Sequence, residues 1–153
     1  STGKGQSPVR PEGTVMQRLI ALLISLTILA TACSGGVLSL SVGDCFDYPD
    51  GADEVSDVEI LDCGEAHDNE VFATYDLPGS VFPGQDVVQA DASAGCVTRF
   101  EPYVGSDFET SSLGIGSFVP SPTSWDQDDH EVVCFLNDFD GDTLTASAKG
   151  TGI

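Results

Sequence analysis

Apolar and polar residues alternate in several short runs along this chain. Alternation with a period of two is typical of β-strands, because successive side chains point to opposite faces of a sheet. We expect strands at residues 37–46, 58–63, 69–77, 113–119, 131–136 and 144–148, of which residues 131–136 (EVVCFL) are a nearly continuous apolar run and the most strand-like. We therefore expect a sheet of short strands, with the last two runs joined by a hairpin turn at Asp140-Gly141.

The run at residues 69–77 has a clear two-sided pattern. Val71, Ala73 and Tyr75 fall on one side of a regular strand. Phe72 and Thr74 fall on the other side.

One segment instead follows the period of a helix. Its apolar residues recur every four positions: Val88, Ala92, Cys96 and Phe100. Such a stripe is typical of a helix that packs on a sheet. Pro102 disfavours helical backbone at the residue before it, so the pattern predicts a helix over about residues 86–100. A short helical turn is expected at residues 121–125. The predicted fold class is α+β, an antiparallel sheet with one main helix packed on it.

An uninterrupted apolar run precedes these elements. Residues 19–30 (LIALLISLTILA) follow Met16 and Arg18, and Ala30-Thr31-Ala32 ends the run with small residues. As a helix the run would be roughly 20 Å long, too short for a bilayer core of about 30 Å. The pattern predicts a leader or signal peptide over residues 1–32, with Met16 as its true start.

Cys33 follows this run directly. The stretch Leu29-Ala30-Thr31-Ala32-Cys33 is similar to a bacterial lipobox, in which the cysteine thiol is lipidated after cleavage. We expect Cys33 to be lipidated, residues 33–41 to form the lipid-anchored N-terminus with a short linker, and residues 42–150 to form the domain. Two alternatives stay open: secretion with a free thiol, and an uncleaved anchor.

The charge of the chain is strongly one-sided. The formal net charge is −20 at pH 7, from 25 acidic and 5 basic residues. Beyond residue 33 the basic residues are Arg99 and Lys149 alone. Such a surface repels phosphate backbones, which argues against nucleic-acid binding and favours cations or basic protein surfaces as partners. Solubility, or adaptation to a salty habitat, would explain the acidity equally well.

Four further cysteines lie in the acidic domain. Outside the cytoplasm an even set of cysteines is typical of disulfides. Cys45 and Cys63 flank two predicted strands, whereas Cys96 lies on the predicted helix and Cys134 in the most strand-like run. Of three possible pairings, we therefore expect Cys45–Cys63 and Cys96–Cys134. Zinc binding is disfavoured, because no cysteine pair has the C-x-x-C spacing.

Several stretches together resemble the septum formation domain family of actinobacterial envelope proteins. They are Val42-Gly43-Asp44-Cys45-Phe46, Cys63 with His67-Asp68 and Glu70-Val71-Phe72, Gly95-Cys96 with Phe100 and Tyr103-Val104-Gly105, and Pro122-Thr123 with Trp125 and Cys134 before Asp140-Gly141. The resemblance implies a membrane-attached, disulfide-bonded module outside the cytoplasm, with a role in septum formation or cell division. Pro102 departs from the family pattern, in which the helix continues.

His67 is the first candidate for chemistry. It lies in the segment CGEAHDNEV, where Asp68 and Glu70 could raise the basicity of the imidazole. The structural alternative, which we favour, is a histidine that fixes the turn into the next strand.

Two acidic groups are further candidates. Asp138, Asp140 and Asp142 match the first, third and fifth ligands of a calcium loop, but Thr143 replaces the glycine that the loop needs. Trp125 precedes a second group, which could bind or hydrolyse a sugar: Asp126, Asp128, Asp129, His130 and Glu131. A solvated turn and a core tryptophan are the structural alternatives.

The patterns together predict a non-catalytic, lipid-anchored binding module on the outer face of the cell membrane. Its expected partner is an envelope protein or a cell-wall component, and no cofactor is expected. An envelope hydrolase that uses His67 or the acidic group near Trp125 is one alternative. A weak calcium-binding module is the other.

Overall fold

This computed structural model describes residues 2, 39–48 and 58–153. Met16, the predicted leader apart from residue 2, and the predicted lipidation site Cys33 lie outside the described residues. In the part that is described, no helix combines the length and the apolar character needed to span a bilayer.

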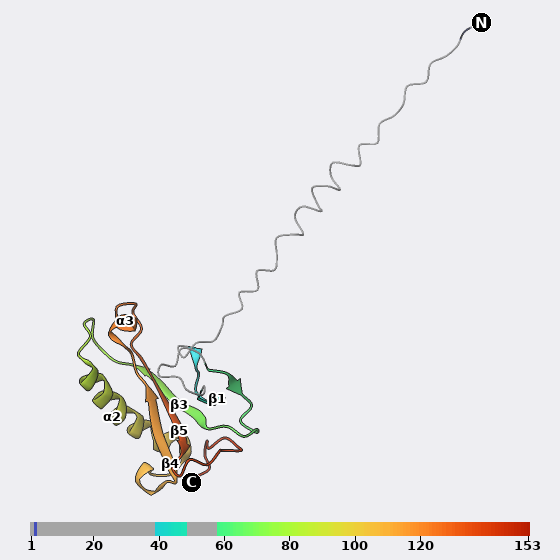
Figure 1. The fold of residues 1–153 in the computed structure, drawn as a ribbon, viewed down its shortest axis with the longest axis vertical. Coiled ribbons are helices and arrows are strands. Elements are labelled where there is room, and N and C mark those ends of the chain that lie inside the picture. Colours follow the sequence, from blue (N-terminus) through green and yellow to red (C-terminus); the bar gives the residue numbers. More distant parts are fainter. Residues whose placement is uncertain (1, 3–38, 49–57) are drawn as a thin grey trace. The chain divides into compact units, whose positions relative to one another are not determined.

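Five antiparallel strands form one sheet (Figure 1). The strands are β1 (Cys45–Phe46), β2 (Ile60–Leu61), β3 (Asn69–Asp76), β4 (Leu113–Phe118) and β5 (Glu131–Asp138). Their order across the sheet is β2-β1-β3-β5-β4. The helical elements are α2 (Gln85–Val104), η2 (Phe108–Thr110) and α3 (Pro122–Trp125). Helix α2 lies against one face of the sheet, so the predicted α+β class is confirmed.

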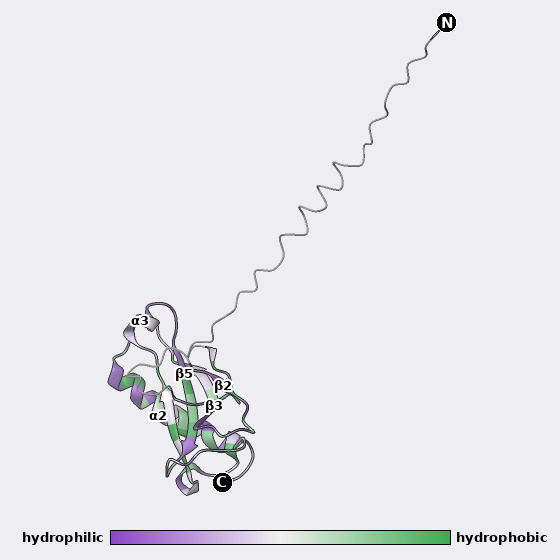
Figure 2. Ribbon diagram, turned by 45° about the vertical axis from the view of Figure 1, so that its right-hand side comes forward, coloured by the Kyte–Doolittle hydropathy of each residue, from purple (hydrophilic) through white to green (hydrophobic). Residues whose placement is uncertain are grey.

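The sheet separates two clusters of buried side chains. Val132, Cys134 and Leu136 of β5 face α2 and pack with Phe100. Val133 and Phe135 point to the opposite face, where they pack with Phe46, Leu40 and Phe118. Figure 2 shows hydrophobic residues concentrated along this central strand. The period-two pattern of β5 therefore determined which residues enter each cluster.

A β-bulge changes the expected pattern of β3. The pairing with β5 shifts between Val71 and Ala73, so Phe72 is the extra residue. Phe72 and Ala73 consequently both join the cluster under α2, whereas Val71 packs on the opposite face. The regular alternation predicted for residues 69–77 is wrong at this point, because a bulge re-aims the side chains that follow it.

The helix is longer than the sequence pattern indicated. It continues through Pro102 to Val104 and ends at Gly105, whose backbone has φ +91° and whose N–H donates to the Glu101 carbonyl. Pro102 removes one helical hydrogen bond, but Tyr103 and Val104 are buried. Burial of these two side chains offsets the local cost of the proline.

Two of the predicted strands are largely replaced by turns. Of the predicted strand 37–46 the structure describes residues 39–46, and among these only Cys45 and Phe46 form a strand, because the Asp44 carboxylate accepts from the Ser41 N–H and Gly43 has φ +98°. Residues 144–148 form no strand either. Leu144 makes a single antiparallel bridge to His67, so the expected hairpin after β5 is wrong.

Both predicted disulfides are present. Cys45–Cys63 ties β1 to the segment that follows β2, with a Cα–Cα distance of 5.3 Å. Cys96–Cys134 ties α2 to β5, with a Cα–Cα distance of 5.6 Å. The second bridge lies in the core under the helix and fixes α2 on the sheet.

Candidate functional site

A buried carboxylate joins three parts of the fold. Glu70 of β3 is fully buried and accepts three hydrogen bonds. Tyr103 Oη at the end of α2 donates to Oε1 (2.6 Å), and Ser147 Oγ donates to the same oxygen (2.5 Å). The Ala148 N–H donates to Oε2 (2.7 Å). These contacts explain why residues 144–148 leave the sheet: the carboxylate binds that segment in place of a strand partner.

The same contacts change the acidity of Tyr103. Burial raises the pKa of its phenol well above the ordinary value of 10.0, and the hydrogen bond to Glu70 raises that pKa further. A protonated phenol that donates to a fully bonded carboxylate holds structure together and offers no base to a substrate. We therefore assign this cluster a structural role.

His67 lies beside this cluster and is itself fully buried. Its Nδ1 donates to the Glu65 carbonyl oxygen at 2.8 Å, and its backbone pairs with Leu144. Nε2 has no hydrogen-bond partner in the described part of the chain. This geometry matches a histidine that fixes the turn into β3.

Cys45, His67 and Glu70 come close enough to suggest a metal centre. Among the described residues they form the one group of three possible ligands whose atoms all lie within 4.8 Å of one another. The sulfur of Cys45 is bonded to Cys63, however, and both oxygens of Glu70 accept hydrogen bonds. A disulfide sulfur is not the thiolate that binds metals, so these residues do not fit an ion.

Trp125 is buried at the far end of β3. Its ring stacks on His130 at 3.9 Å between centroids and meets the edge of the Phe82 ring. Its Nε1 has no hydrogen-bond partner among the described residues. The indole therefore anchors the loop before α2 to the loop before β5, as the structural alternative predicted.

The acids that follow Trp125 lie at the start of β5. Burial raises the pKa of Glu131, a hydrogen bond from Thr74 opposes that rise, and the nearby Asp76 and Asp129 increase it. Asp128 adopts φ +65° within the turn, and the Asp129 carboxylate accepts from the Glu131 N–H. These acids shape a turn.

The aspartates at the end of β5 also stabilise a turn. Asp138 Oδ1 accepts from the backbone N–H groups of Asp140 (2.9 Å) and Asp142 (3.3 Å). Among the described residues, the carboxylates of Asp138, Asp140 and Asp142 do not come close enough together to form a metal-binding group. The Asp138 carboxylate therefore stabilises the backbone of the turn through these hydrogen bonds.

The candidate residues for chemistry are far apart. His67 precedes the first residue of β3, and the Leu77 N–H just beyond its last residue donates to the His130 carbonyl beside Trp125. An eight-residue strand spans about 26 Å, so His67 and Trp125 do not share a site.

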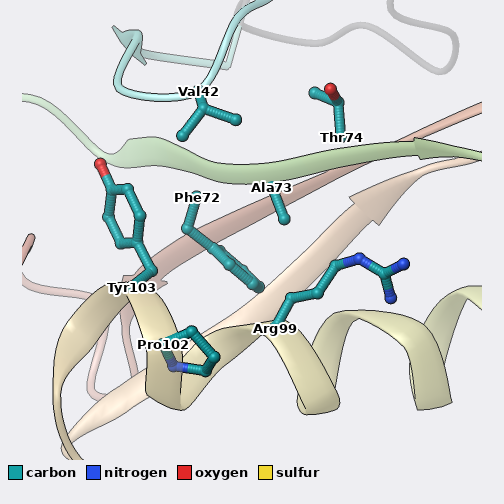
Figure 3. A pocket seen from close by; sticks show the side chains of 7 residues that line it. All are labelled: Val42, Phe72, Ala73, Thr74, Arg99, Pro102 and Tyr103. Atoms are coloured by element: carbon teal, nitrogen blue, oxygen red, sulfur yellow. The ribbon is translucent and has the colours of Figure 1, made fainter.

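Helix α2 covers the middle of the sheet and leaves a groove on each side. The first groove, here the β3 groove, has a volume of about 330 Å³. Its lining residues are Val42, Phe72, Ala73, Thr74, Arg99, Pro102 and Tyr103. Figure 3 shows the Arg99 side chain extending from α2 toward β3. The guanidinium lies 3.8 Å from the centroid of the Tyr75 ring and donates to the Gly95 carbonyl.

The second groove, here the β4 groove, lies between α2 and β4 and has a volume of about 310 Å³. It contains no charged residue. Its lining residues are Gln89, Ser93, Cys96, Val97, Phe108, Ile115, Gly116 and Ser117. Apolar walls with a few polar groups are typical of binding grooves. The hydrophobic pattern of the sequence does not reveal this groove, and its one local signal is that Ser93 and Val97 are one helical turn apart beside the apolar stripe.

Comparison with known proteins gives one match. The family model described as septum formation matches residues 42–152. No curated protein and no solved structure matches the chain. The match covers both disulfides, α2 and all five strands.

Proposed function

Because the chain belongs to the septum formation family, we propose that residues 42–152 form a non-catalytic binding module of the bacterial cell envelope. The observation that carries the proposal is a rigid sheet, braced by two disulfides, that presents grooves on both sides of α2. Rigid scaffolds with preformed grooves suit recognition, because binding then costs little ordering entropy.

The two disulfides indicate a domain outside the cytoplasm, since thiols stay reduced inside it. Lipid attachment at Cys33 is the finer part of the proposal. Its support is the apolar run at residues 19–30, which is separated from this cysteine only by the small residues Thr31 and Ala32. Cleavage and acylation at Cys33 would hold the domain at the outer face of the membrane.

Intact mass of the membrane-extracted protein tests the anchor. We expect a chain that begins at Cys33 and carries added acyl chains, and a Cys33→Ala variant that leaves the membrane fraction. An unmodified Cys33 in a membrane-bound chain would overturn the lipid anchor and leave the folded module intact.

A non-catalytic role is supported by the separation of the candidate groups. The buried His67 and the buried Trp125 lie at opposite ends of β3, and neither lines the two grooves described above. The purified protein should not turn over cell-wall glycan or peptide. If the wild type and the Trp125→Phe variant did turn over such a substrate and the His67→Ala variant did not, the domain would be a hydrolase. That result would overturn the proposal.

The proposed partner is an envelope protein or a cell-wall component. The domain's negative charge favours basic surfaces and disfavours nucleic acid. Crosslinking in growing cells followed by mass spectrometry should recover one defined envelope partner. Its recovery should fall at high salt, because exposed charges are screened.

A further inference from the structure

The outer edge of β4 presents unpaired backbone groups beside the β4 groove. The Phe139 N–H donates to the Ser112 carbonyl, which makes these two residues a hydrogen-bonded pair. In an antiparallel ladder, bonded and non-bonded pairs alternate. The bonded positions are therefore Gly114 and Gly116, and the backbone groups of Ile115 and Ser117 point away from β5.

A further hydrogen bond supports this assignment. The Leu113 N–H donates to Ser111 Oγ instead of to β5. The backbone N–H of Leu113 therefore points away from β5, as those of Ile115 and Ser117 do. No hydrogen bond of the described residues engages the outward backbone groups of Ile115 and Ser117.

The outward backbone and the groove belong to the same residues. The side chains of Ile115 and Ser117 line the β4 groove opposite Val97 of α2. A strand that paired with Ile115 and Ser117 would extend the sheet and direct alternate side chains into the space beside α2. This combination of a free edge and a helix-walled groove is the geometry used for strand addition.

The β4 edge lacks the features that normally block pairing. Natural edge strands carry charges, proline or bulges that prevent association. The sequence of β4, LGIGSF, contains none of these. The free side of β3, by contrast, has the bulge at Phe72, the charged Asp76 and the overlying Arg99. Only one of these two edges is therefore left suitable for a partner strand.

Charge selects the kind of strand that can bind. The β4 groove is uncharged, but exposed acids lie close to it along the chain: Asp107 and Glu109 flank Phe108. Asp86 precedes Gln89 by three residues and Ser93 by seven, which places it on the same side of α2. The two basic residues of the described chain, Arg99 and Lys149, do not line the groove. A second copy would bring the same acids together and be repelled.

We propose that β4 and α2 bind an extended segment of a basic envelope protein, which adds to the sheet as a sixth strand. The segment would place alternate apolar side chains between Val97 and Ile115. Lysine or arginine on either side would meet Asp86, Asp107 and Glu109. This inference rests on the proposed binding function and specifies where and what the module binds.

A display library of random ten-residue peptides, selected against the whole 153-residue chain in detergent, tests the proposal. We expect enrichment of peptides with alternating apolar residues between basic residues. Amide exchange of Ile115 and Ser117 should slow when a selected synthetic peptide is added. Amides of residues 72–76, on the β3 side, should keep their rates.

A matched pair of variants controls this test. Val97 and Val87 both lie on α2 with similar exposed fractions, 43% and 47%, but only Val97 lines the β4 groove. Val97→Arg should lower the affinity of the domain for the selected peptide about tenfold or more. Val87→Arg should change this affinity by less than about twofold. Equal effects of the two variants would show general charge attraction and overturn the proposal.

Other outcomes also decide the question. Failure to enrich any peptide, enrichment of acidic peptides, or protection of residues 72–76 instead of β4 would each overturn the β4 assignment. A photocrosslinker at position 97, compared with position 87, separates this failure from failure of the broader function. A partner captured in cells equally from both positions would retain a binding module and reject the β4 groove.

Discussion

Tyr103 Oη donates a 2.6 Å hydrogen bond to Oε1 of the fully buried Glu70. This contact joins the end of α2 to β3, and Ser147 and Ala148 bind the same carboxylate. Ser147 and Ala148, in the segment after β5, are therefore held by a side chain that lies 77 residues before Ser147.

Tyr103 should make the domain sensitive to alkaline pH. Its pKa is raised above the ordinary 10.0, first by burial and then by the bond to Glu70. The folded protein thus holds this proton more tightly than the unfolded chain. The resulting stability is complete below pH of about 10 and is lost as the pH rises through the folded pKa. Urea unfolding between about pH 8 and pH 11 measures this loss.

The Tyr103→Phe variant separates this effect from that of other tyrosines. It should be less stable by about 2 kcal/mol at pH 8, because Glu70 loses a donor. Its stability should also fall less between about pH 10 and pH 11 than that of the wild type. Burial also raises the pKa of Tyr48 and Tyr75, so some pH dependence will remain. Parallel curves for both proteins would contradict the assignment.

Glu70→Gln should destabilise the domain by about 3 kcal/mol. The amide keeps one acceptor oxygen and brings an NH₂ group toward the remaining donors, so a buried polar group loses its partner. Glu59→Gln removes the same charge from an exposed position and serves as the control. Thermal unfolding of the two variants, with exchange rates of the Ala148 amide, measures the difference. Similar melting temperatures for both would show that the contacts of Glu70 contribute little.

Removing the two disulfides should have unequal effects. In the chain-entropy model, the 18-residue bridge Cys45–Cys63 contributes about 3 kcal/mol and the 38-residue bridge Cys96–Cys134 about 4 kcal/mol. Replacing Cys96 and Cys134 by alanine also leaves space under α2. We expect this double variant to have the lower urea midpoint of the two. The opposite order would mean that the N-terminal strands contribute more to stability than the helix.

Gly116→Ala should destabilise the domain by about 1–3 kcal/mol through overpacking. A Cβ at this position would lie 2.2 Å from Cε2 of Phe135, which is buried among aromatic rings and cannot move away. At Gly114 the nearest atom is Oδ1 of the half-buried Asn137, at 2.5 Å. That amide can turn toward solvent, so Gly114→Ala is the milder control. Calorimetry of both variants measures their unfolding temperatures. A Gly114→Ala variant less stable than Gly116→Ala would contradict the prediction.

The local signals in the sequence predicted much of the framework. The apolar stripe from Val88 to Phe100 located α2, and the nearly continuous apolar run at residues 131–136 located β5. The pairing of the cysteines followed from the elements on which they lie. These features depend on the period of side chains along one element, which the sequence displays directly.

The features that the local patterns did not predict depend on contacts between distant residues. The bulge at Phe72, the continuation of α2 through Pro102 and the segment bound by Glu70 all contradict a local rule. Tertiary packing and a buried carboxylate outweigh local preference there, because several buried contacts act together against one backbone preference.

The sequence by itself determined the helix, the main strands, the two disulfides and the acidic character of the domain. Tertiary structure alone decided that His67 and Trp125 lie apart, that Glu70 closes the core, and that Ile115 and Ser117 present a free edge beside Val97. Periodicity specifies which face of an element is buried. It does not specify which elements meet, because that depends on packing between residues far apart in the chain.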